Sequence, residues 1–432
     1  MSDAATRKIK VWRVRILATT WLSYAGFYFC RKNYAIVKSS VLETLEITRS
    51  ELAHIFTVYL IAYMLGQFLT SFLGRRVATR VLLLAGMAIT LICNVAFGFT
   101  YLMGPAGYVP MLVLMVVNGF AQATGWPGNV GVLSNWLQRR ERGRIMAVWA
   151  TSYQLGSILA KSFAAFLLAA AGAVWSFWGA AAVMLVVWVL FLLFQRDRPE
   201  DAGLPSLVEE VEVEVPVGDG PAERVHQSGW FAGWTRSVIF TVFSMGACYF
   251  VFKFLRYSLD SWSPMAIEEL FGLGKARAGF VSTVFDWVGF LGVFVAGWAT
   301  DRYFAGRRYQ TIVMMTIGMV FAFAFLAIFG VRSVWLFALG LSLCGFMLMG
   351  PDSLLSGVGA IDVGGRKGAI VAAGLINGLG SIGPIFQEEI IGVVLDRYGQ
   401  RSSFYLLIGM SIIGVFGTLY LAHRSRRGRS NL

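Results

Sequence analysis

The stretches Phe27-Tyr-Phe-Cys-Arg31 and Phe252-Lys-Phe-Leu-Arg256 each carry an arginine late in a long apolar segment. A Glu-x-Leu sequence begins at the same distance beyond each arginine, as Glu43-Thr-Leu45 and as Glu268-Glu-Leu270. An internal repeat with a constant offset indicates repeated structural units. The two halves of the chain are therefore predicted to share one helical architecture.

The whole chain is unusually apolar. Of its 432 residues, 57% are hydrophobic and 14% are charged, which is far from the composition of soluble domains. A membrane-spanning helix needs about 20 predominantly apolar residues, and we identify twelve such segments. They are centred near Tyr24, Ile61, Met87, Val117, Leu159, Met184, Cys248, Val288, Ile317, Leu341, Ala373 and Met410. The sequence therefore predicts an all-α membrane protein with 12 transmembrane helices.

The composition changes after the sixth predicted helix. Residues 196–232 are polar and rich in glutamate, proline and glycine, so we interpret them as a cytoplasmic linker. Residues 1–195 are then an N-terminal six-helix bundle, and residues 233–432 a C-terminal one. If a pseudo-twofold axis relates the bundles, Arg31 and Arg256 face each other across a central cavity.

The formal net charge of +13 invites a nucleic-acid partner, but the distribution of the charge favours another explanation. Lys and Arg gather in the N-terminal arm and in alternate connections, for example in Arg139-Arg-Glu-Arg-Gly-Arg144. The opposite connections hold few, and we count Lys38 among them. Because cytoplasmic loops of membrane proteins are rich in Lys and Arg, both termini are expected in the cytoplasm and no nucleic acid is expected as a partner.

Five cations lie inside predicted helices: Arg31, Lys32, Lys161, Lys253 and Arg256. A guanidinium does not shed its proton, and placing it in hydrocarbon costs about 2.5 to 17 kcal/mol depending on the reference state. Arg31 and Arg256 therefore need partners, and we interpret an anionic substrate as that partner. The alternatives are an acid within the membrane or a position at the membrane interface.

Several stretches resemble the organophosphate:phosphate antiporter family of the major facilitator superfamily. They are Tyr28-Phe-Cys-Arg-Lys-Asn-Tyr34, Asn118-Gly-Phe-Ala-Gln-Ala-Thr-Gly-Trp-Pro127, Leu255-Arg-Tyr-Ser-Leu-Asp-Ser-Trp-Ser-Pro264 and the loop signature Gly297-Trp-Ala-Thr-Asp-Arg302. The resemblance covers nearly the whole chain. It implies the major facilitator fold, and it implies an interdomain role for Asp301 and Arg302.

The function that the resemblance implies is exchange of a phosphorylated metabolite, either hexose 6-phosphate or glycerol 3-phosphate, for inorganic phosphate. The chain departs from the bacterial glycerol-phosphate carriers at three positions. Gln67 stands where they have Lys, Tyr153 where they have His, and Lys253 where they have Tyr. The organic part of the substrate is accordingly left open between the two classes.

Two arginines offer planar pairs of donors that match phosphate oxygens, so we expect Arg31 and Arg256 to bind the phosphate. Tyr24 and Tyr28 precede Arg31 on one helix face and are candidates for further substrate contacts, as is Lys253, one turn before Arg256. Each of these three could equally be structural. Gln67 and Tyr153 complete the candidate set.

The acidic residues within or near the membrane segments are expected to have different roles. Asp286 lies inside the eighth predicted helix and is expected to pair with Lys253 or Arg256, either as a charge switch released by substrate or as a fixed ion pair. The remaining acids lie nearer helix ends, where we expect solvated or capping roles. They are Asp260, Asp352, Asp362, Glu388 and Glu389.

No arrangement of nucleophile and base and no cluster of metal-ligating residues is found in the sequence, so neither an enzyme nor a metal or cofactor is predicted. We expect a monomer in the bilayer, with a phosphate ester and inorganic phosphate as its small-molecule partners. The absence of an Asn-x-Ser/Thr sequon favours a bacterial plasma (inner) membrane. Two other functions stay open, namely a membrane sensor of external hexose phosphate that signals to a histidine kinase and a carrier of other organic anions.

Overall fold

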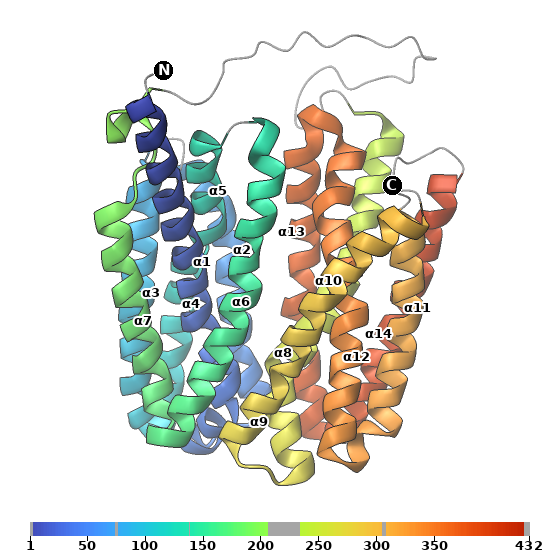
Figure 1. The fold of residues 1–432 in the computed structure, drawn as a ribbon. Coiled ribbons are helices and arrows are strands. Elements are labelled where there is room, and N and C mark those ends of the chain that lie inside the picture. Colours follow the sequence, from blue (N-terminus) through green and yellow to red (C-terminus); the bar gives the residue numbers. More distant parts are fainter. Residues whose placement is uncertain (1–2, 74–76, 138, 206–233, 305–307, 427–432) are drawn as a thin grey trace. The chain divides into compact units, whose positions relative to one another are not determined.

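The computed structural model describes residues 3–73, 77–137, 139–205, 234–304 and 308–426. All regular secondary structure in these ranges is helical (Figure 1). The helices of the first half are α1 (Asp3–Leu45), α2 (Arg49–Leu73), α3 (Thr79–Leu102), η1 (Gly104–Gly107), α4 (Tyr108–Gln122), α5 (Gly125–Trp136), α6 (Arg139–Ala171), α7 (Ala173–Phe194) and η2 (Glu200–Ala202). Those of the second half are α8 (Arg236–Phe271), α9 (Lys275–Ser282), α10 (Val284–Tyr303), α11 (Arg308–Ile328), η3 (Gly330–Arg332), α12 (Val334–Ser353), the π-helix η4 (Leu354–Val358), α13 (Gly359–Tyr398) and α14 (Gln400–Arg426).

Ten runs of described helix are long and apolar enough to span a membrane. The run Gly104–Leu133 combines η1, α4 and most of α5, and the run Lys275–Thr300 combines α9 and most of α10. With α1 and α2, which are 43 and 25 residues long, these runs account for the twelve predicted spans. The prediction of an all-α membrane protein with twelve spanning helices is confirmed.

The chain divides into two compact units. One comprises Met1–Val215 with Lys275–Phe280, and the other Pro216–Gly274 with Val281–Leu432. Most of the predicted linker lies outside the described residues, but its first part does not. The backbone carbonyl of Arg196 accepts a hydrogen bond from the Trp136 indole at 3.0 Å, and the Asp197 carboxylate accepts one from the Arg80 backbone N–H at 3.0 Å. The start of the linker is therefore held against α3 and α5.

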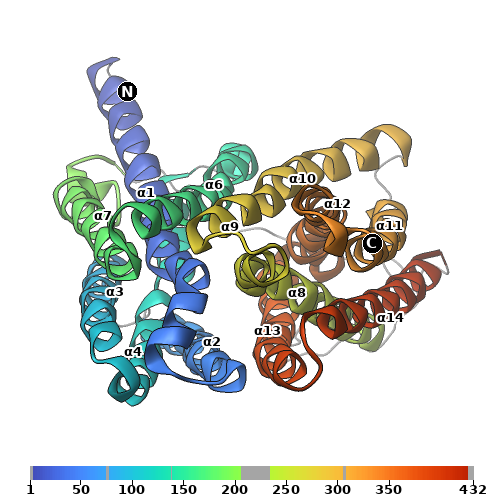
Figure 2. The ribbon, with the colours of Figure 1, turned by 90° about the horizontal axis from the view of Figure 1, so that it is seen from below.

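In the first unit α1 lies among the other helices and packs against α5, α6 and α7 (Figure 2). Its buried aromatic and sulfur-containing side chains, such as Phe27 and Cys30, join a core that includes Trp136, Trp149 and Met184. The fourth predicted span is broken into α4 and α5. Pro127 lacks a backbone N–H, and it lies in the first turn of α5, where the missing donor costs the helix no hydrogen bond.

In the second unit α8 occupies the corresponding place and packs against α12, α13 and α14 (Figure 2). The Thr235 hydroxyl caps its start by accepting from the Val238 backbone N–H, and Gly272 ends it with a positive φ of 63°. At Gly383 of α13 a side chain would collide with the carbonyl of Phe250 on α8. This glycine therefore lets α13 approach α8 closely.

The expected position of Lys38 in an external connection is wrong. Helix α1 continues without a break to Leu45, so Lys38 is part of the helix and is 0% exposed. Its ammonium lies 5.9 Å from the centroid of the Tyr34 ring and 5.7 Å from that of Phe56. Gly74-Arg-Arg76, which resembles part of the loop signature Gly297–Arg302 and ends the second span of the first half, lies outside the described residues. All four cysteines, Cys30, Cys93, Cys248 and Cys344, are buried free thiols.

Candidate functional site

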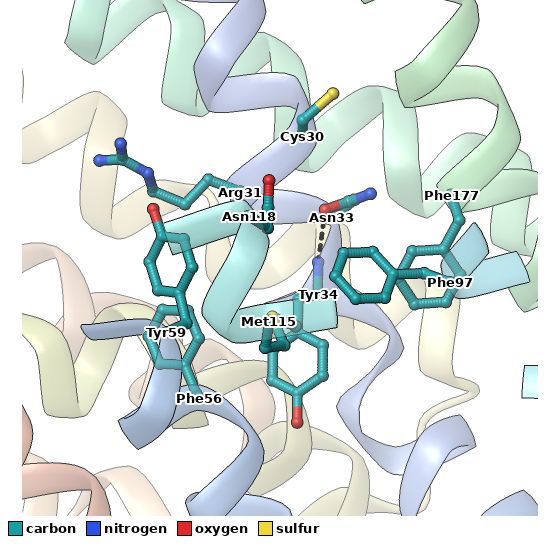
Figure 3. Close-up of a pocket in the computed structure, with 10 residues that line it drawn as sticks. All are labelled: Cys30, Arg31, Asn33, Tyr34, Phe56, Tyr59, Phe97, Met115, Asn118 and Phe177. Atoms are coloured by element: carbon teal, nitrogen blue, oxygen red, sulfur yellow. Dashed lines mark hydrogen bonds between the residues drawn. The ribbon is translucent and has the colours of Figure 1, made fainter. Parts of the chain in front are cut away.

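Arg31 is buried on α1, with 8% of its surface exposed. Its Nε donates a hydrogen bond to Gln122 Oε1 on α4 at 2.9 Å, and the same oxygen accepts from the Tyr59 hydroxyl on α2 at 3.1 Å. Figure 3 shows the guanidinium above the Tyr59 hydroxyl, at the end of a side chain that extends away from Phe97 and Phe177. Three helices therefore meet at one buried arginine.

The amide of Gln122 is oriented by two further hydrogen bonds. Its Nε2 donates to Asn118 Oδ1 at 3.2 Å and to the backbone carbonyl of Cys30 at 3.1 Å. Because these two acceptors fix the nitrogen end of the amide, the oxygen end must face Arg31 and Tyr59. Gln122 is 0% exposed, so it acts as a rigid internal support for the guanidinium.

Tyrosine rings surround the guanidinium. The Arg31 Cζ lies 4.6 Å from the ring centroid of Tyr63, 5.0 Å from that of Tyr28 and 5.9 Å from that of Tyr59. Such rings attract a cation through their negative faces and leave the N–H groups available. Arg31 Nη2 is buried and donates to no atom among the described residues. The arrangement stabilises the charge while leaving a strong donor in search of an acceptor.

A small cavity lies beside the arginine (Figure 3). Its volume is about 10 Å³, and Arg31, Asn33, Tyr34, Tyr59 and Asn118 are among its lining residues. A single water molecule needs roughly 10–15 Å³. The cavity is therefore a gap in the packing behind Arg31, far too small for a sugar phosphate.

The other candidates of the first unit form part of the same aromatic cluster. Tyr24 packs edge-on against Tyr28, with ring centroids 5.6 Å apart, and Tyr28 lies 6.4 Å from Tyr153 of α6. The Tyr24 ring also packs against Trp149 of the core, with ring centroids 5.5 Å apart, so Tyr24 is part of that core. Gln67 is half-buried on α2, four residues beyond Tyr63. The structure therefore brings Tyr24, Tyr28 and Tyr153 together near Arg31.

In the second unit Arg256 of α8 forms an ion pair with Asp352 of α12. The Nη1–Oδ2 distance is 2.9 Å, and the Asp352 side chain is 7% exposed. The guanidinium carbon lies 5.2 Å from the Tyr257 ring centroid. The expectation of a solvated or capping role is wrong for Asp352, and likewise for Asp260 and Glu388, which are also buried. Asp352 and Glu388 are both buried, and Glu388 accepts hydrogen bonds from the Ser261 hydroxyl and the Trp262 indole.

Lys253 lies one turn before Arg256 and is held by α13. Its Nζ donates to Asn377 Oδ1 at 2.6 Å, to Ser381 Oγ at 2.9 Å and to the Asn377 carbonyl at 3.4 Å. Its ammonium also lies 4.9 Å from the Tyr249 ring centroid. An ammonium has three N–H donors, so these three acceptors can engage all of them.

The remaining candidates lie on α10. Asp286 is buried in its first turn, where its backbone N–H donates to the Thr283 carbonyl. The structure shows an ion pair between Arg256 and Asp352, and the pairing of Asp286 with Lys253 or Arg256 stays a prediction, as does its switch role. Arg302 is exposed in the last turn. The side chains of Asp301 and Asp362 lie outside the described part of the chain.

The neutral polar groups of both sites are not among the residues predicted from the sequence. Gln122 lies within the stretch Asn118–Pro127, which resembles the family, but the resemblance implies no role for it. A clear signal was available, because Asn118 and Gln122 are uncharged polar residues in an apolar segment, spaced by one helical turn. Asn377 and Ser381 repeat this spacing on α13. Such pairs in a membrane helix identify a polar face.

Comparison with known proteins identifies the family to which this chain belongs. The model of the Major Facilitator Superfamily matches residues 20–388 and 245–431. The membrane sensor protein UhpC of Escherichia coli is 28% identical over 94% of this chain and 90% of its own. The glycerol-3-phosphate transporter of Bacillus subtilis is 27% identical over 96% of this chain and 92% of its own length. A "probable hexose phosphate transport protein" of Chlamydia muridarum is 25% identical over 96% of this chain and 91% of its own length.

Solved structures agree on the fold. A bacterial homologue of the human lysosomal transporter Spinster, in an inward-facing conformation, has a TM-score of 0.72 at 13% identity and covers 95% of this chain and 97% of its own. A D-xylose–proton symporter has a TM-score of 0.70 at 13% identity, and the match covers 94% of this chain and 96% of the symporter. The chain belongs to the major facilitator superfamily, and its relatives over about 95% of its length are the organophosphate carriers and sensors of that superfamily.

Proposed function

We propose that the chain exchanges a phosphorylated metabolite, hexose 6-phosphate or glycerol 3-phosphate, for inorganic phosphate by alternating access. The observation that carries the proposal is Arg31, a buried guanidinium whose Nη2 amino group has no described acceptor. A phosphate monoester carries a charge of about −1.5 to −2 at neutral pH and has three strong acceptor oxygens. It supplies both the charge and the acceptor that this site lacks.

Arg256 supports the proposal from the second unit, because it matches Arg31 under the sequence repeat. Arg256 is already paired with Asp352, whereas no described carboxylate pairs with Arg31, so an empty carrier keeps an uncompensated buried cation, which disfavours its change of conformation. A bound dianion compensates Arg31 and offers acceptors to the remaining N–H donors of Arg256, which permits the exchange between conformations. The empty carrier then crosses slowly, and exchange of one phosphate compound for another becomes the obligatory mode.

The proposal includes the setting of the exchange. The carrier works as a monomer in a bacterial plasma membrane, with both termini in the cytoplasm. Lys253, Gln67 and Tyr153 contribute to the choice of the organic group, since they are the positions at which the chain departs from glycerol-phosphate carriers. Asp301 and Arg302 keep an interdomain role.

The test is uptake of labelled glucose 6-phosphate or glycerol 3-phosphate into proteoliposomes. Vesicles loaded with inorganic phosphate are expected to take up label at least tenfold faster than vesicles loaded with sulfate at equal osmolarity. Equal rates in the two preparations would exclude obligatory exchange with phosphate. Tight binding of the label without uptake in either preparation would favour a sensor, the second candidate, which the similarity to UhpC supports.

Replacing Gln122 with leucine is expected to raise the KM for phosphate about tenfold or more, with a smaller effect on the maximal exchange rate. The leucine removes the acceptor of the Arg31 Nε, and a hydrogen bond to a charged group contributes about 1.5–3 kcal/mol. The measurement is labelled phosphate exchange across a range of phosphate concentrations. The matched control is Gln387→Leu, because Gln387 is equally buried but its amide has no hydrogen bond among the described residues. A KM that changes equally in both variants would contradict the positioning role of Gln122.

A further inference from the structure

Helices α11 and α14 pack side by side in the second unit (Figure 2), and a groove lies between them where α11 begins and α14 ends. The volume of this α11–α14 groove is about 570 Å³, which falls within the range of ligand-binding sites. The two arginines assigned to the phosphate lie on other helices, α1 and α8. The groove is therefore a feature that the proposed function does not use.

The end of the groove near the helix termini is basic. His423 and Arg426 line it from α14, and they share one face of that helix because they are three residues apart. Both side chains are exposed. Gln310 of α11 also lines the groove and adds an amide NH₂ donor. None of the described lining residues is acidic, so this end of the groove favours an anion.

A second arginine of α14 has a different role. Arg424 precedes Arg426 by two residues, which places it on another side of the helix, since successive residues are rotated by about 100°. Its Nη2 donates to Ser237 Oγ at 3.1 Å and to Thr241 Oγ1 at 3.3 Å on α8. Its guanidinium carbon lies 4.7 Å from the Phe240 ring centroid. Arg424 therefore holds α14 against α8, whereas Arg426 belongs to the groove.

The other end of the groove is apolar. Met314 and Ile317 line it from α11, and Leu419 lines it from α14; all three are exposed. The apolar surface continues one turn further along each helix with Phe321 and Phe416, which are also exposed. A free phosphate would leave this surface uncovered, whereas the acyl chains of a lipid would cover it.

We propose that the α11–α14 groove is a binding site for an anionic phospholipid. The phosphate of the headgroup accepts hydrogen bonds from Arg426 and His423, and an acyl chain lies along Met314, Ile317 and Leu419. Basic pockets between membrane helices suit anionic headgroups. A zwitterionic lipid binds more weakly, because it brings a cation of its own close to the guanidinium. This lipid site is independent of the proposed exchange function.

The test is native mass spectrometry of the purified full-length protein, titrated in detergent with dioleoyl phosphatidylglycerol or with dioleoyl phosphatidylcholine. The wild type is expected to bind one phosphatidylglycerol molecule more tightly than phosphatidylcholine. Arg426→Gln is expected to weaken the binding of phosphatidylglycerol about fivefold, which is the contribution of one basic residue near an anionic lipid. Adding His423→Gln is expected to remove the preference for phosphatidylglycerol.

Arg236→Gln is the matched control, because Arg236 is an exposed arginine at the start of α8, near the residues that Arg424 contacts, and it does not line the groove. This variant is expected to bind phosphatidylglycerol as the wild type does. Equal affinity of the wild type for the two lipids, or an equal loss in Arg426→Gln and Arg236→Gln, would overturn the site. Displacement of the bound lipid by inorganic phosphate would show that the groove binds a free anion and would also overturn the proposal.

Discussion

Replacement of Arg31 with lysine is expected to lower phosphate exchange about 100-fold, with the amount of protein in the membrane close to that of the wild type. Lysine keeps the charge but lacks the planar fork that binds two phosphate oxygens at once. Its ammonium is also too compact to reach Gln122 while lying among the rings of Tyr28, Tyr59 and Tyr63. Loss of a buried, hydrogen-bonded charge contact costs about 2–5 kcal/mol, or about 30-fold to 4,000-fold in affinity.

Exchange of labelled phosphate in proteoliposomes measures this effect, and immunoblotting of membranes measures the abundance. Arg332→Lys is the matched control, because Arg332 is exposed in the short connection between α11 and α12. It is expected to exchange phosphate at the wild-type rate. If Arg31→Lys retained full exchange, the binding site would have to lie elsewhere.

Replacement of Arg256 with glutamine is expected to abolish exchange and to destabilise the protein. The variant loses one phosphate ligand and also leaves Asp352 buried without its cation. Breaking a buried ion pair by removing one partner costs about 3 kcal/mol or more. The measurements are phosphate exchange in proteoliposomes and the thermal unfolding temperature of the purified protein in detergent.

The double variant Arg256→Gln with Asp352→Asn separates the two effects. Its unfolding temperature is expected to return close to that of the wild type, since no unpaired charge is left, whereas its exchange stays abolished. A double variant as unstable as Arg256→Gln would show that the ion pair is not the origin of the instability. Recovery of exchange in the double variant would exclude Arg256 as a phosphate ligand.

The architecture could be predicted because its signals are strong and local. Continuous apolar segments identify the helices, and the repeat around Arg31 and Arg256 identifies the two halves. Burying a charged group inside such a segment costs so much free energy that its presence indicates a function. The neutral groups around Arg31 carry no such cost, and Gln122 and Tyr59 come from different helices. Only the packing of those helices against α1 brings them to the arginine.

The misplaced residues have a common physical cause. Lys38 and Asp352 lie far from the centres of their apolar segments, so hydrophobicity alone predicts that they lie at or beyond the helix ends. Helix α1 instead continues to Leu45, and α12 passes through the π-helix η4 directly into α13. Backbone hydrogen bonds keep a helix going wherever packing covers it, so polar residues at its apparent ends become interior residues.

The burial of all four native cysteines has a practical consequence. A thiol packed inside a helix bundle reacts slowly with maleimides, because the reagents need an accessible thiolate. The unmodified chain can therefore serve as the background for spin or fluorophore labels on cysteines introduced at exposed positions, such as Trp175 of α7 and Trp335 of α12. A label on each unit would report, as a distance distribution with and without phosphate, how far the two move during one transport cycle.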